Sequence, residues 1–297
     1  MFQFLIDTLI RTSDLALVAL GLSMVYGLVK FPNIAHVQYA MLGAYLSYFF
    51  HVAGLPMALA IAASCCVTGV LTLLMHLLVF RRLLRSGPAI TMIGSLALAM
   101  LVVAVTLGVA GSFPLMYKLP LSAPLVIDEV RIGYTQLYAL ATTALLLALF
   151  AALLFYTRTG RAMRALSTNR ALAAASGLDA ESITRLVNFS SGALAALGGS
   201  MLAMTSGAHI NLGYDMLLPV FAAAILGGLG NPLGAVAGAF LIALTETVVT
   251  NINFGWMFGK PVAFLPVAYI SAASFLILLL ALLLKPYGLF DREVRRV

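Results

Sequence analysis

Long apolar runs follow one another along this chain, and charged residues stand mostly between them. No Asp, Glu, Lys or Arg lies between Lys30 and Arg81, and Asp215 is the only one between Arg185 and Glu246. A helix needs about 20 apolar residues to cross a bilayer, so each interval has room for one or more crossings. The apolar runs occupy residues 10–29, 34–52, 57–80, 89–111, 134–157, 186–206, 216–230, 234–250 and 263–284. This pattern predicts an all-α polytopic membrane protein with eight to nine transmembrane segments.

The composition agrees with a membrane protein. Hydrophobic residues make up 63% of the chain and charged residues 9%, whereas about 25% of residues are charged in a soluble domain. We therefore expect one transmembrane domain over residues 1–297, surrounded by membrane lipid. The net charge of +7 would also suit a nucleic-acid partner, but the bases gather at the predicted membrane ends, so no such partner is expected.

Basic residues predict the orientation, because cytoplasmic loops are rich in Lys and Arg. They form three clusters: Arg81, Arg82 and Arg85; Arg158, Arg161, Arg164, Arg170 and Arg185; and Lys285, Arg292, Arg295 and Arg296. All three are expected on the cytoplasmic side, which puts the C-terminus there and the loop 112–133 outside. The N-terminus lies outside if segment 34–52 crosses fully, and inside if that segment only re-enters.

Two apolar segments carry helix breakers. The first reads "YGLVKFPNIAHVQYAMLGAYL" around Pro32, and the second reads "LGGLGNPLGAVAGAFLIALTE" around Gly230, Asn231 and Pro232. Proline removes a backbone donor and glycine allows free turning. Inside lipid, such a break is tolerated only against protein or a water-filled cavity. We therefore predict two interrupted helices that shape a transport pathway.

A second interpretation of the same segments stays open. "AMLGAYL" and "AVAGAFL" resemble each other, and Gly-Ala-rich helices do so by composition alone. The glycines between residues 192 and 238 then only allow helices to approach closely.

Polar groups inside the apolar runs are the candidate pathway residues, because such groups are costly in a membrane. They are Asn33, His36, Tyr39, Asn188 and Glu246. Asn33 and His36 share a helix face if the helix resumes at Asn33, and Gln38 follows them. These side chains either line the conduit or form hydrogen bonds with the backbone groups that Pro32 leaves without a helical partner. Glu246 faces the pathway or pins its helix through hydrogen bonds, unless it lies close enough to the outer surface to be solvated.

The predicted cytoplasmic loop over residues 158–185 reads "RTGRAMRALSTNRALAAASGLDAESITR". Three further motifs accompany this loop: "FPNIAHVQYAMLGAY", "LGGLGNPLGAVAGAFLIALTE" and the tail "KPYGLF". Through these four segments, the chain resembles the permease family of branched-chain amino-acid ABC importers, the Liv-type high-affinity permeases. In that family this loop contacts the ATPase, and Arg161, Arg164, Asn169 and Gly177 match its pattern. Ala171 departs from it, since family members often carry Glu there.

The resemblance implies a permease subunit of the type II importer kind in a bacterial inner membrane. It implies four partners: a second related permease, two cytoplasmic ATPases and a periplasmic solute-binding protein. The expected cargo is branched-chain amino acids or a related small amphipathic solute. "LGGLGNPLG" lacks the Lys and Ser or Thr of a phosphate loop, so no cofactor is expected in this chain, and ATP and Mg would be bound by the partner ATPases.

Two other functions are considered. "GYD" at Gly213–Asp215 and "GLGN" at Gly228–Asn231 resemble the paired motifs of intramembrane aspartyl proteases, but Asn231 cannot supply the second carboxylate that this chemistry needs. The chain is therefore not expected to be an enzyme. The alternative is a secondary carrier or channel, which would work without an ATPase and would need no docking loop.

Overall fold

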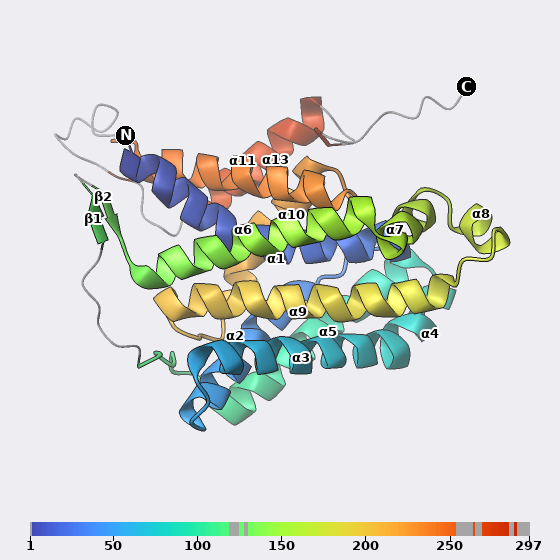
Figure 1. Cartoon of the computed structure of the whole chain (residues 1–297), viewed down its shortest axis with the longest axis horizontal. Helices are drawn as coiled ribbons and strands as arrows, with labels where there is room; N and C mark the ends of the chain where they lie inside the picture. Colours follow the sequence, from blue (N-terminus) through green and yellow to red (C-terminus); the bar gives the residue numbers. More distant parts are fainter. Residues whose placement is uncertain are drawn as a thin grey trace.

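The computed structural model describes residues 2–118, 125–127, 130–253, 264, 269–284 and 288–289. Helices dominate this part of the chain (Figure 1). They are α1 (Phe2–Val29), α2 (His36–Val52), α3 (Met57–Met75), the π-helical turn η1 (His76–Phe80), α4 (Arg81–Leu83), the 3₁₀ turn η2 (Leu84–Ser86), α5 (Pro88–Ala110), α6 (Tyr134–Tyr156), α7 (Arg158–Thr168), α8 (Arg170–Ala175), α9 (Ala180–Ser206), α10 (Leu212–Gly227), α11 (Pro232–Asn251) and α13 (Ile270–Leu284). Two short antiparallel strands, β1 (Leu125–Ile127) and β2 (Val130–Ile132), pair with each other.

Each apolar run predicted from the sequence contains a helix, so the all-α polytopic fold is confirmed. In the described residues, six helical segments are long and apolar enough to cross a membrane. They are α1, α3 with its continuation to Ser86, α5, α6, α9 and α11. The helices α2, α10 and α13 have 17, 16 and 15 residues and fall short of this length. The predicted number of eight to nine transmembrane segments is therefore not confirmed.

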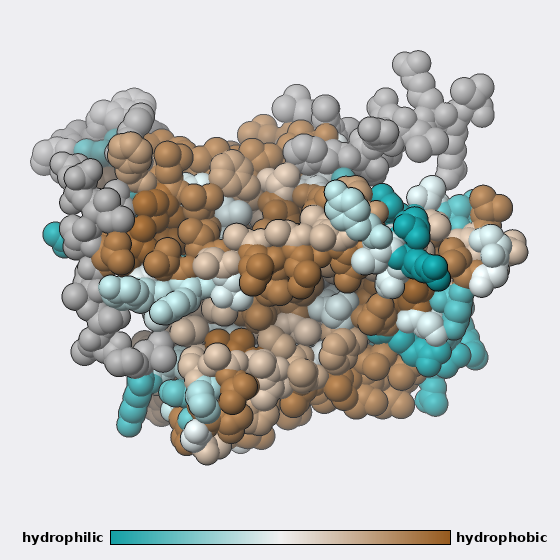
Figure 2. Space-filling view, viewed as in Figure 1, coloured by the Kyte–Doolittle hydropathy of each residue, from teal (hydrophilic) through white to brown (hydrophobic). Residues whose placement is uncertain are grey.

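The helix α1 lies at the centre of the bundle. Its most apolar stretch is 89% buried, against 28% for α5 and 22% for α6. It packs against α9, α10, α11 and α6. By contrast, α5 and α6 direct large apolar side chains such as Met100 and Leu145 outward. Figure 2 shows brown atoms over α6, in the middle of the molecule. An outer surface this apolar suits lipid contact.

Small residues let these helices approach one another closely. A Cβ on Gly199 would lie 2.0 Å from the carbonyl oxygen of Ala40, so α9 touches the backbone of α2. Hydroxyl groups connect α3 and α9 to α2: Ser64 of α3 and Ser200 of α9 both donate to the carbonyl of Gly43, at 2.7 and 3.1 Å. Close packing is therefore one role of the glycines, as the second interpretation of the breaker segments expected.

The two ends of the bundle differ. One end, which we call the arginine-rich end, holds α4, α7 and α8 and appears teal in Figure 2, whereas β1 and β2 lie at the opposite end, the strand end (Figure 1). The N-terminus of α1 lies at the strand end, where the Arg131 amide donates to Gln3 Oε1 at 3.0 Å. The N-terminus thus shares a side with the loop 112–133.

The first breaker segment leads the chain back into the protein. Helix α1 ends at Val29 at the arginine-rich end, yet His36 at the start of α2 lies beside Val18 and Gly21 of α1. Gly21 is about 12 Å along the helix from Val29. The irregular segment between the two helices is buried, with Phe31 1% exposed, and the Ile34 amide donates to Ser95 Oγ at 3.1 Å. Residues 30–35 thus depart from helical geometry around Pro32, between two separate helices, and protein covers this departure.

The second breaker segment is a turn between two antiparallel helices, and the prediction of an interruption within one helix is wrong there. Pro232 is the first residue of α11, a position that tolerates proline because its missing N–H has no helical partner. Asn231 caps this helix by accepting from the Gly234 amide at 3.1 Å. Gly228 and Gly230 both have a φ of 94°, which lets the chain reverse between α10 and α11.

Candidate functional site

The predicted pathway residues of the first breaker segment lie in the interior of the subunit. Asn33, His36 and Tyr39 are 2%, 0% and 1% exposed. The His36 ring places Nε2 3.1 Å from the Val18 carbonyl oxygen and meets the Tyr39 ring edge-on at 6.3 Å between centroids. Helix α2 begins at His36 and not at Asn33, so the condition under which these two residues would share a helix face is not met. The irregular segment at residues 30–35 precedes the helix.

Several polar atoms of this group have no hydrogen-bond partner within the described residues. They are Asn33 Oδ1, His36 Nδ1, both amide atoms of Gln38, Tyr39 Oη and Tyr45 Oη. Gln38 lies against Gly213 at the start of α10. An unpaired buried polar atom costs about 1–3 kcal/mol, so such a concentration along one helix is uncommon. Sequence reasoning did not single out Tyr45, because it resembles the other aromatic residues of an apolar helix.

Asn188 lies one helical turn from the His36 neighbourhood. Gly21 of α1 faces both the His36 ring and the Ser191 carbonyl of α9. Asn188 is 2% exposed, and its carbonyl accepts from Ser191 Oγ at 3.0 Å. Its own side chain donates to the Thr184 carbonyl at 2.8 Å, within the same helix. Asn188 thus borders the polar residues of α2, and none of its hydrogen bonds within the described residues reaches them.

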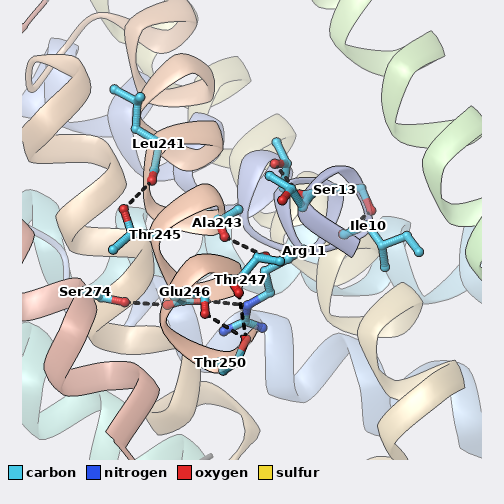
Figure 3. Close-up of polar contacts among 12 residues, drawn as sticks. Ile10, Arg11, Ser13, Leu241, Ala243, Thr245, Glu246, Thr247, Thr250 and Ser274 are labelled. Carbon is cyan, nitrogen blue, oxygen red and sulfur yellow. Dashed lines mark hydrogen bonds and ion pairs between the residues drawn. The ribbon is translucent and has the colours of Figure 1, made fainter. Parts of the chain in front are cut away.

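Glu246 joins three helices (Figure 3). Its carboxylate accepts from Arg11 Nε of α1 at 2.6 Å and from the Ser274 hydroxyl of α13. Glu246 is 2% exposed, so the interpretation that it is solvated at the outer surface is wrong. The carboxylate connects α11 to α1 and α13 through these hydrogen bonds. Arg11 is about 10 Å along α1 from Val18, the residue that His36 contacts. The ion pair of Glu246 and the polar residues of α2 therefore contact α1 at different depths.

The residues predicted to contact an ATPase lie on the surface at the arginine-rich end. Helix α7 buries Met163 and Leu166 and exposes Arg161 and Arg164. With Asn169 and residues of α8, these two arginines line a cavity of about 700 Å³. Asn169 caps α8 by accepting from the Leu172 amide at 3.0 Å.

The end of this segment is shaped by two local features. Gly177, with a φ of 87°, ends α8. Asp179 caps α9, and the hydrogen bonds from the Ser182 hydroxyl and amide hold the pKa of its carboxyl below its usual range. Ala171, the one position that departs from the expected loop pattern, is exposed.

The second breaker segment lies beside these arginines. A cavity of about 550 Å³ is lined by Gly230, Asn231 and Pro232 and also by Arg164. Gly230 packs against α1: its amide donates to Ser23 Oγ at 3.3 Å, and a Cβ there would lie 3.2 Å from Cα of Gly27. The structure thus brings the helix-break residues and the predicted coupling residues together, which the sequence did not indicate.

The geometry also excludes the aspartyl protease interpretation. Asp215 lies in the first turn of α10, and its side chain is 69% exposed. Asn231 follows the other end of α10, and the helix rises about 18 Å between Asp215 and that end. The two motifs therefore cannot meet at one catalytic site.

Comparisons with known proteins identify the family. Residues 4–284 match the family model described as "Branched-chain amino acid transport system / permease component". The chain is 29% identical to the probable branched-chain amino acid transport permease protein LivH of Methanocaldococcus jannaschii, over 95% of this chain and 90% of the relative. It is 28% identical to the high-affinity permease protein BraD of Pseudomonas aeruginosa, over 99% and 97% of the two chains.

Two further proteins are similar to this chain. LivH of Escherichia coli K12 is 26% identical over 96% of this chain and 94% of the relative. Among solved structures, "PsaBC from Streptococcus pneumoniae in complex with Fab" matches with a TM-score of 0.49 and 17% identity, over 97% and 94% of the two chains. The members of this family are transport permeases and not catalytic enzymes. The family model spans nearly the whole sequence, and the chain therefore belongs to the permease component family of branched-chain amino acid transport systems.

Proposed function

We propose that this chain is the transmembrane permease subunit of an ATP-driven ABC importer and forms half of its translocation pathway. The cargo is branched-chain amino acids or a related small amphipathic solute, the class named for the relatives. Family membership over residues 4–284 carries this proposal. The partners are a second related permease, two ATPases that bind ATP and Mg, and a periplasmic binding protein that delivers the solute.

The proposed orientation places the arginine-rich end in the cytoplasm of a bacterial cell and the strand end in the periplasm. Two of the three basic clusters belong to α4, α7 and α8 and the segments beside them, as the positive-inside rule requires. The C-terminal segment belongs to the same end, because the Leu289 amide donates to the Leu226 carbonyl at 2.8 Å, next to the turn at residues 228–231. The C-terminus is then cytoplasmic and the N-terminus periplasmic.

In this proposal, α7 and α8 transmit ATPase movements to the pathway. Arg161, Arg164 and Asn169 are available on the surface, and Gly177 sets the turn that follows them. Arg164 also lines the cavity beside the Gly230 turn, and α7 packs against α1, α6 and α9, so a displacement of α7 would be passed to these membrane helices. These contacts are a physical connection from the docking surface to the membrane helices.

Asn33, His36 and Tyr39 are proposed to face the solute when the pathway opens, with Asn188 and Glu246 at its border. The unpaired buried atoms of Asn33, His36 and Tyr39 support this role, because a conformation that exposes them would relieve a cost of about 1–3 kcal/mol for each atom. Few polar groups suffice if the binding protein provides most of the selectivity.

The test is charge reversal on the docking surface. The double variant Arg161→Glu with Arg164→Glu is expected to abolish ATP-driven uptake in vesicles that contain the full transporter, while the protein still inserts. Arg161→Lys with Arg164→Lys keeps both charges and is the matched control for lost side-chain shape. Undiminished uptake in the Glu variant, or uptake by the permease without an ATPase, would instead favour a secondary carrier or channel.

A further inference from the structure

A cavity at the arginine-rich end has no role in the proposed function. It has a volume of about 330 Å³ and lies between the end of α3 and the start of α9, beside α8. Its polar lining comes from segments far apart in the sequence: His76 of η1, Arg81 of α4, Arg85 of η2, Arg170 of α8, and Glu181 and Thr184 of α9. Figure 1 shows α4 and α8 at this end of the bundle.

The charge of this cavity is unbalanced. Three guanidinium groups face one carboxylate, so the lining carries two excess positive charges. Glu181 is already engaged by Arg81, at 3.3 Å, and Arg170 donates to the Leu28 carbonyl at 3.4 Å. Arg85 makes no hydrogen bond or ion pair with the residues that the structure describes. Like-charged groups gathered in one cavity repel one another, and a bound anion would offset this repulsion.

His76 provides a second and independent observation. It is 6% exposed and lines the cavity, yet its ring makes no hydrogen bond within the described part of the chain. It begins a π-helical turn, a distortion that is frequent at functional sites. The nitrogens of His76 are not among the fully buried unpaired atoms of the described residues, so they reach the cavity, where an imidazole N–H can donate to an acceptor.

The cavity lies where the apolar surface ends. The helix α3 and the turn η1 are apolar up to Phe80, and the basic residues Arg81, Arg82 and Arg85 follow directly. Under the proposed orientation, on which this inference rests, this is the boundary between membrane and cytoplasm, where lipid phosphates lie and cytoplasmic solutes have access. The volume is about ten times that of one water molecule in the liquid, enough for a phosphate group and part of what it is attached to.

We propose that His76, Arg81, Arg85 and Arg170 form a binding site for a phosphate-bearing anion. Arginine favours this chemistry because its planar fork pairs with two phosphate oxygens at once. Basic pockets between membrane helices on the cytoplasmic side bind anionic lipid headgroups, and a free phosphate presents the same oxygens. Because Arg170 belongs to α8, a bound anion would join the arginine-rich loop to the ends of α3 and α9.

The experiment measures binding and does not depend on transport. Purified permease in neutral detergent is titrated in two arms, one with phosphatidylglycerol against phosphatidylcholine and one with inorganic phosphate against chloride at equal ionic strength. Thermal unfolding and native mass spectrometry are the readouts. In at least one arm, the wild type is expected to be stabilised by the phosphate compound and not by its control.

The variant Arg85→Gln is expected to weaken this binding about tenfold, as for the loss of one charge-assisted hydrogen bond. Arg82→Gln is the matched control, since it removes the same charge from the same cluster but does not line the cavity. Retained binding in Arg82→Gln supports the site, and the responsive arm identifies a lipid headgroup or a free phosphate as the source. Equal weakening in both variants, or no response in either arm, would overturn the proposal.

Discussion

The two breaker segments look alike in the sequence but do different things in the structure. Residues 30–35 carry the chain back into the protein as irregular backbone, and the helix that follows holds polar atoms without partners. Residues 228–231 form a tight turn at the arginine-rich end, and the helix that follows is capped by Asn231 and tied by Glu246. Proline, asparagine and glycine thus mark a change of direction, and only the surrounding contacts decide its form.

The difference suggests a division of roles. Helix α11 is held at its start by a cap and near its end by an ion pair, so it suits a fixed part of the subunit. Helix α2 is tightly packed, but His36, Gln38 and Tyr39 leave hydrogen-bonding capacity unused. Such a helix stands to gain from a second conformation, as an alternating pathway requires. The following predictions test this comparison.

The largest effect is expected at the ion pair that ties α11. Arg11→Met should lower the free energy of unfolding by about 3–5 kcal/mol, because it leaves the carboxylate of Glu246 buried without its charged partner. Chemical denaturation in detergent measures this change. The double variant Arg11→Met with Glu246→Gln removes the stranded charge and should recover most of the loss. A single variant as stable as the wild type would mean that the pair does not hold α11.

A smaller loss is expected at the turn before α11. Gly230→Leu should destabilise the protein by about 2–4 kcal/mol and impair transport, because a side chain at this φ is strained and would press on Gly27. Gly54 also has a positive φ, of 101°, but has open space around its Cβ position, so Gly54→Leu isolates the backbone strain. Equal losses in the two variants would show that the contact with α1 contributes nothing.

The cap of α11 is expected to contribute less. Asn231→Ala should cost about 1 kcal/mol, because the Gly234 amide loses its acceptor. Asn231→Ser keeps an acceptor at the same position and should lie closer to the wild type. Thermal unfolding of the three proteins side by side provides the measurement, and an order in which Ser is as damaging as Ala would contradict the capping role.

The smallest effect on stability, with a clear effect on transport, is expected in α2. Tyr39→Phe removes a hydroxyl that has no partner in the described residues, so stability should stay within about 1 kcal/mol while solute uptake falls. Unchanged uptake would argue against a pathway role for Tyr39.

Tyr117→Phe is the matched control. Its hydroxyl donates to the Ala44 carbonyl at 2.7 Å, and burial raises the pKa of Tyr117 to about 12, so the group stays a neutral donor. Removal of this satisfied hydroxyl should cost stability without a specific effect on uptake.

Part of this architecture could be predicted from the sequence because it depends on local chemistry. Apolar runs locate the helices, arginines locate one end of the bundle, and Pro232 after Asn231 fits the start of a helix as well as a break. The last example also shows the limit. The same residues are compatible with an interrupted helix and with a turn between two helices, and nothing local distinguishes the two.

Other features depend on contacts between distant parts of the chain. Glu246 was recognised as a costly intramembrane carboxylate, but its partner Arg11 lies 235 residues earlier. The proximity of Arg164 to the Gly230 turn and the charged cavity around Arg85 likewise join segments that share no sequence pattern.

The sequence by itself determined that this protein is a helical bundle in a membrane, which end is basic and where the chain must depart from helical geometry, since these follow from side-chain hydrophobicity, charge and backbone freedom. Only the tertiary structure decided which break enters the interior, which carboxylate is paired and which arginines share a cavity. The physical reason is that a buried polar group is stabilised or left unpaired by whatever segment packs against it.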